Sequence, residues 1–163
     1  MEKINSLIFN DLEIENDFRN LLSLRFSEDD VFDLYNREIN FIPMDSDLRG
    51  KIDLPAVTFS IFQSESINDD DIEIQRYVPF TIEIEVYTSG DSKVLKNKQL
   101  CNIIIELLQS NGPLENYYSR GLKLKENREV GTVIDSAYRR LLRMSAICDN
   151  KRKLILRGEE NGW

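Results

Sequence analysis

The fold is decided by the stretch 77–87, which reads YVPFTIEIEVY. From Phe80 to Val86 every second residue is apolar, and Thr81, Glu83 and Glu85 stand between or beside them. Side chains of a β-strand point alternately to the two faces of a sheet. This period of two therefore predicts a strand with one face in the core and the other facing water or a partner.

The residues after this strand predict a turn followed by a helix. Ser89, Gly90, Asp91 and Ser92 are typical of a turn that also caps a helix. Apolar residues then recur at spacings of three and four through 92–110, which predicts an amphipathic helix. The sequence NGP at 111–113 ends it, because proline cannot continue a helix.

The residues before the strand predict helices followed by a second strand. Residues 3–26 carry apolar positions at helical spacing, with a break near 12–14 as an open alternative. Residues 29–35 suggest a short helical turn, and 55–62 are β-branched and aromatic, hence a strand. We expect loops at 36–54 and at 63–72.

The last third of the chain is partly ambiguous. Residues 120–126 alternate and predict a strand, whereas 134–148 fit either a helix or a strand. Asp149-Asn150 followed by 151–156 resembles the turn and return strand of a hairpin. The hairpin interpretation favours a strand at about 137–148.

Together these elements predict an α+β fold: a small mixed, mainly antiparallel sheet flanked by helices, with a C-terminal β-hairpin. A chain of 163 residues is the size of one domain, so we expect a single domain over 1–163. Its helical region would span about 3–36 and its sheet-and-helix core about 55–157.

Charge is polarised along the chain, whose net charge is −8. Residues 1–92 hold 21 acidic and 7 basic residues, whereas 119–157 hold 4 acidic and 11 basic ones. The two regions either neutralise each other within one fold or meet between copies, and complementary patches favour head-to-tail rings. The basic segment lacks interleaved exposed aromatic residues, so we expect no specific nucleic-acid partner.

The sequence offers little for catalysis or metal binding. It contains no histidine and no glycine-rich phosphate loop. Its two cysteines, Cys101 and Cys148, are read as buried apolar residues. An acidic loop at 69–73 and the pair Glu83 and Glu85 are read as solvated carboxylates rather than a metal or acid–base site. We therefore expect no cofactor, no metal and no enzymatic activity.

Two segments carry a resemblance to a known family, and with the helix between them they cover around half of the chain. These are 80–93, which ends in YTSGDSK, and 135–148, which begins DSAYRRLLR. In these segments, and in the order of its predicted helices and strands, the chain resembles the tail terminator, or tail completion, proteins of long-tailed bacteriophages and phage-like bacteriocins. That resemblance implies a structural protein in a virion or phage-like particle tail, contractile or non-contractile, assembled in the bacterial host cytoplasm.

The resemblance also implies partners. Such proteins form a ring, commonly a hexamer, which caps the tail tube, stops its polymerisation and offers a head–tail joining surface to sheath, neck or head connector proteins. It implies no membrane partner, and no apolar run approaches the ~18 residues that span a bilayer. The alternatives are another head–tail connector or neck protein, or a small cytosolic binding or regulatory module.

The residues themselves suggest where a subunit or tube interface lies. If 137–148 is a strand, one face mixes Arg139 and Arg143 with Leu141 and Ile147. Neither a solvated face nor a core normally combines arginine with large apolar residues, whereas interfaces do. We take these four residues, with Glu83 and Glu85, as the candidate interface. We expect the arginines to be exposed and to meet acidic residues of a neighbouring subunit or the rim of the tube.

Overall fold

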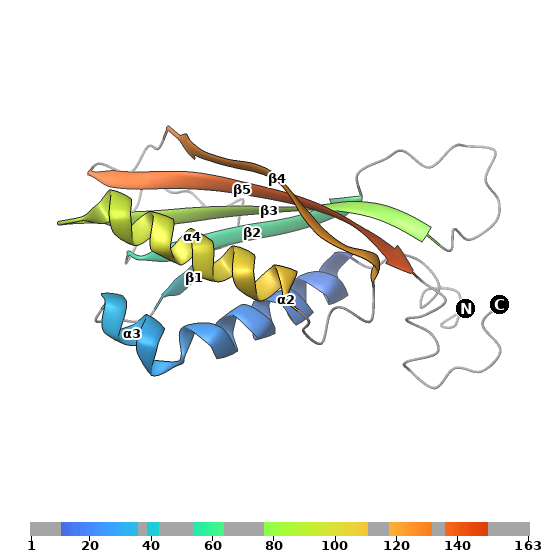
Figure 1. The fold of residues 1–163 in the computed structure, drawn as a ribbon, viewed down its shortest axis with the longest axis horizontal. Helices are drawn as coiled ribbons and strands as arrows, with labels where there is room; N and C mark the ends of the chain where they lie inside the picture. Colours follow the sequence, from blue (N-terminus) through green and yellow to red (C-terminus); the bar gives the residue numbers. More distant parts are fainter. Residues whose placement is uncertain are drawn as a thin grey trace.

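Figure 1 shows the computed structural model as a sheet with helices on one side. Six segments of the chain are described: residues 11–35, 39–42, 54–63, 77–110, 118–131 and 136–149. The elements that position the candidate interface all lie within these segments.

The described segments form a sheet of five strands in the order β1-β2-β3-β5-β4. The central strands are β3 (Tyr77–Ser89) and β5 (Ala137–Asp149), which pair antiparallel along their whole length. Strand β2 (Ala56–Gln63) pairs antiparallel with β3, and β4 (Tyr118–Val130) pairs antiparallel with β5. Only the short β1 (Asn40–Ile42) runs parallel to its neighbour, β2. The sheet is therefore mixed and mainly antiparallel, as predicted.

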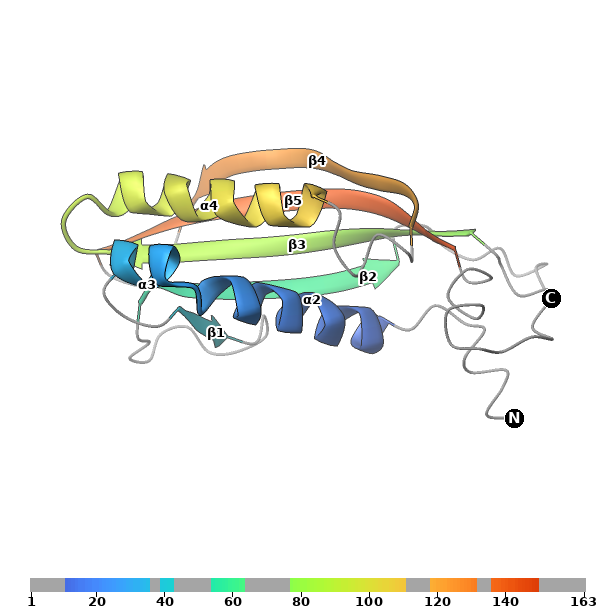
Figure 2. The same cartoon turned by 60° about the horizontal axis from the view of Figure 1, so that its bottom comes forward.

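Within the described residues, three helices cover one face of this sheet (Figure 2). Helix α2 (Asp11–Phe26) packs on β2, and α3 (Asp29–Tyr35) follows it beside β1. Helix α4 (Lys93–Gln109) lies across β3, β5 and β4. Both α2 and α4 bury apolar residues spaced by three or four, the set Ile14, Phe18, Leu22, Leu100, Ile104 and Leu108.

The core lies between the helices and the sheet. The β3 residues that the alternation placed on the core face, from Phe80 to Val86, are at most 1% exposed. On β5 the residues Leu142, Met144, Ala146 and Cys148 face the same core. The strand assignment for 137–148 and the burial of both cysteines are thus confirmed.

The structure departs from the sequence prediction at several element boundaries. Helix α2 runs unbroken from Asp11, so the break considered near 12–14 is absent. Strand β1 lies inside the predicted loop 36–54, where its three residues are too few to show a period. Strand β4 extends beyond the predicted 120–126, because irregular pairing with β5 interrupts its alternation.

The predicted hairpin is only partly described. Its return strand, 151–156, lies outside the described residues. Strand β5 is paired along both edges, with β3 on one side and β4 on the other. The hairpin that the structure describes near this end of the chain is accordingly the pair β4–β5.

Asn97 fixes α4 to the sheet, a role that the sequence pattern did not reveal. Its side chain is fully buried, and Nδ2 donates to the carbonyl oxygens of Val86 at 2.8 Å and Tyr138 at 3.2 Å. The Cys101 thiol donates to Asn97 Oδ1 at 3.4 Å. One amide thereby bonds both central strands from the middle of the helix layer.

We expect Asn97→Leu to lower the free energy of unfolding by about 2 kcal/mol. The apolar side chain has a similar size but donates no hydrogen bond, so the interactions with both strand carbonyls are lost. Urea denaturation measures the change. Asn102→Leu is the matched control, because Asn102 is exposed on the same helix and its loss should change stability by no more than about 0.5 kcal/mol. Equal effects of the two variants would contradict the anchoring role.

Candidate interaction surface

The face of the sheet opposite the helices carries every residue of the candidate interface. No other described helix or strand packs on this open face (Figures 1 and 2). Its part around Tyr87 is nevertheless buried, where Leu54 and Ala56 cluster with that residue. Register places Glu83 opposite Arg143 and Glu85 opposite Leu141, with Tyr87 opposite Arg139. The structure thus brings together on the open face the six residues that the sequence placed on two separate strands.

One group of charges forms a row across three strands. Arg143 of β5 lies between two glutamates, with Nη2 2.5 Å from Glu83 Oε1 and Nη1 2.5 Å from Glu126 Oε1. The hydrogen bond to Glu83 raises the pKa of Arg143, while hydrogen bonding from Arg128 lowers the pKa of Glu126. The row holds its charges in place along the sheet and leaves them partly accessible to solvent.

A second group surrounds the carboxylate of Glu85, whose side chain is only 12% exposed. This carboxylate accepts a hydrogen bond from Arg139 Nη2, another from the Tyr87 hydroxyl at 2.7 Å and a long one from Thr58 at 3.4 Å. The Arg139 guanidinium lies 5.7 Å from the centre of the Tyr87 ring, and its Nη1 donates to the Gly131 carbonyl. Burial, reinforced by Glu85, raises the pKa of Tyr87 above its usual range.

These contacts correct one expectation from the sequence. Arg139 and Arg143 were expected to be exposed and to meet acidic residues outside their own subunit. Instead they pair with Glu85, Glu83 and Glu126 of the same chain, because β3 and β4 flank β5 in the sheet. Part of the charge polarisation is thus neutralised within the fold.

The apolar members of the candidate interface differ in exposure. Leu141 lies on the open face but is only 7% exposed, so it offers little surface to a partner. Ile147 is half-buried opposite Pro79, and Phe62 of β2, on the same face, is 40% exposed. Phe62 follows the polar Thr58 and Ser60 on this face, and the apolar pair Ile61-Phe62 hides which face it belongs to. Ile147, Pro79 and Phe62 form the apolar end of the open face.

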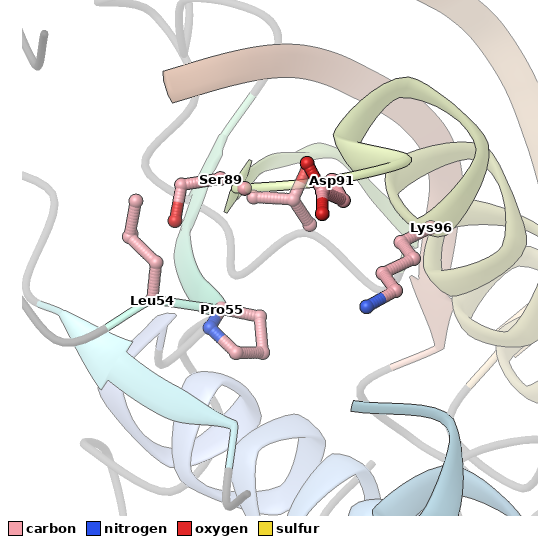
Figure 3. Close-up of a pocket in the computed structure, with 7 residues that line it drawn as sticks. Leu54, Pro55, Ser89, Asp91 and Lys96 are labelled. Carbon is pink, nitrogen blue, oxygen red and sulfur yellow. The ribbon is translucent and has the colours of Figure 1, made fainter. Parts of the chain in front are cut away.

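A cavity of about 350 Å³ lies where β3 ends and α4 begins (Figure 3). It is lined by Leu54 and Pro55, the turn from Thr88 to Asp91, and Lys96, whose ammonium group points into it. One carboxylate and one ammonium group do not make a nucleophile with its base or a set of metal ligands. The cavity therefore suggests no reaction.

Among the described residues, the remaining reactive groups give no catalytic arrangement either. Burial raises the pKa of the Cys101 thiol to about 12, so it remains a protonated, apolar group at neutral pH. Within the part of the chain that the structure describes, no cluster of three or more potential metal ligands occurs. The open face is the surface whose composition most resembles a binding site.

Comparison with known proteins adds no family. No protein-family model matches the sequence, and no curated protein is detectably similar to it. Among the described helices, none has the length and apolar character that crossing a bilayer requires. The assignment of a function therefore depends on the open face and on the sequence resemblance.

Proposed function

We propose that this chain is a non-enzymatic structural subunit of a phage or phage-like tail, which caps the tail tube as part of a ring and joins it to the neck or head. The observation that carries the proposal is the open face of the sheet. A five-stranded sheet covered by helices on one side presents on the other a fixed pattern of ion pairs and apolar side chains.

The composition of this face favours a protein partner. Arg139 and Arg143 are paired with Glu85, Glu83 and Glu126, and Arg128 supplies the third cation by pairing with Glu126, so docking need not bring unpaired charges out of water. The apolar end supplies exposed surface whose burial stabilises a complex. Such a face suits the rim of a tube better than a small substrate.

The sequence resemblance supplies the biological setting. The segments 80–93 and 135–148 that carry it include most of β3 and β5, the two strands whose outer residues form the open face. In this proposal the open face contacts the end of the tail tube. The particle tail is then the location of the protein, which is assembled in the bacterial cytoplasm.

The capping activity is testable with purified components. We expect the protein, added to the tail tube protein encoded in the same genome during polymerisation, to shorten the tubes in proportion to its concentration. Electron microscopy of the tubes gives their length distribution. A neck protein that only joins finished tails would bind tube ends and leave the lengths unchanged, and a regulatory module would not bind. Either outcome would contradict capping.

A further inference from the structure

The two edges of the sheet carry opposite charge. Residues 11–35, which form helices α2 and α3 and the turn between them at the β1–β2 edge, contain eight acidic and two basic residues. Helix α4 and strand β4, toward the other edge, together contain seven basic and three acidic residues. Both views place α3 beside β1 and β4 at the far side of the sheet (Figures 1 and 2).

Internal ion pairs leave some of these charges available. On the acidic side, Arg25 neutralises Glu28 and Asp30, whereas Asp29 and Asp33 are exposed one helical turn apart. On the basic side, Lys123 and Lys125 are exposed on β4, the outermost strand of the described sheet. We call Asp29 with Asp33 the acidic edge, and Lys123 with Lys125 the basic edge.

We propose that copies of this chain associate head to tail, with the basic edge of one copy against the acidic edge of the next. Surfaces of opposite charge at different places on one subunit make heterologous contacts, which close into rings when the rotation between copies permits. The proposal deepens the ring of the proposed function and rests on it for its biological setting. It assigns the contact between subunits to the two edges, where Lys123 borders the open face opposite Ser145, and leaves the outer residues of β3 and β5 for the tube.

The same charges disfavour the competing symmetric contact. An outer strand can pair with its counterpart in a second copy and extend the sheet across a two-fold axis. In that arrangement Lys123 and Lys125 of both copies would lie close together, and the irregular pairing of β4 with β5 would distort the ladder further. A copy that presents Asp29 and Asp33 to β4 instead places carboxylates beside these lysines, so the repulsion between lysines does not arise.

Charge reversal at each edge tests the proposal on the purified chain alone. One variant carries Asp29→Lys with Asp33→Lys, the other Lys123→Glu with Lys125→Glu, and Asp91→Lys at the exposed β3–α4 turn is the control. Sedimentation measures self-association as the protein is concentrated. We expect the wild type to associate weakly in about 0.1 M salt and less in about 1 M salt. The Debye length, over which salt screens a charge, falls from about 10 Å to about 3 Å between these two concentrations.

Each edge variant alone should raise the dissociation constant about tenfold or more, because it presents the same sign of charge at both edges. An equimolar mixture of the two should regain association, since each reversed edge now meets its opposite. The control should behave as the wild type. If the acidic-edge variant does not fold, Asp33→Lys alone replaces it, with thermal melts reporting the fold.

A zero-length carbodiimide cross-linker gives a second readout. Because the two edges lie at opposite sides of one sheet, a bond between the carboxylates of α3 and the amines of β4 must join two chains. We expect such links between isotopically light and heavy copies. A wild type that stays monomeric when concentrated, edge variants that associate like it, or a mixture that stays dissociated would each overturn the proposal. None of these results would alter the tube-length test of capping.

Discussion

Arg139→Glu is expected to lower the free energy of unfolding by about 3 kcal/mol. The substitution removes the cation that neutralises Glu85 and places a second carboxylate beside it. Because the Glu85 side chain is 12% exposed and that of Arg139 27%, water screens the repulsion poorly. The cation above the Tyr87 ring and the bond to the Gly131 carbonyl are lost as well. Urea denaturation measures the loss directly.

Two further variants separate the ion pair from a general effect of charge. Lys98→Glu makes the same change of charge on the exposed side of α4 and should alter stability by no more than about 0.5 kcal/mol. Combining Arg139→Glu with Glu85→Arg restores an opposite pair and should recover part of the loss. If the Arg139→Glu protein is as stable as the wild type, the cluster around Glu85 adds nothing to the stability of the fold. Arg139 would then behave like any exposed arginine.

Much of the sheet was predictable because its period is clear where one face is buried. The apolar residues of β3 alternate with polar ones, and helix α4 repeats leucine and isoleucine at helical spacing. The prediction was least complete where tertiary contacts override local pattern. Strand β1 has three residues, and β4 loses its alternation at irregular pairs with β5.

The candidate surface shows a different limit of sequence reasoning. Alternation put Glu83 and Glu85 on one face of β3, and Arg139 and Arg143 on one face of β5, and both assignments are right. Strand order decides which charges meet, and a single sequence does not reveal that β5 lies between β3 and β4. Asn97 was missed for a related reason, since a polar residue on a helix reads as exposed until its strand partners are known.

The largest functional effect is expected from blocking the open face without disturbing its ion pairs. Ser145 is half-buried on this face, opposite Thr81 and Lys123, and takes part in none of the three arginine–glutamate pairs described above. Ser145→Trp adds bulk that a solvated sheet face tolerates but that a closely packed interface excludes. Asn102→Trp, on the exposed side of α4, is the matched control. Thermal melts of both purified variants verify the fold.

The measurement is the length of tails in cells that lack the native gene and carry each variant in its place. Without the gene, tails should grow beyond their normal length and remain without heads. The wild type and Asn102→Trp should restore tails of uniform length joined to heads, whereas Ser145→Trp should leave them overlong. Normal, head-joined tails in the absence of the gene would contradict the capping function. Normal, head-joined tails in cells that carry Ser145→Trp would contradict the role of the open face.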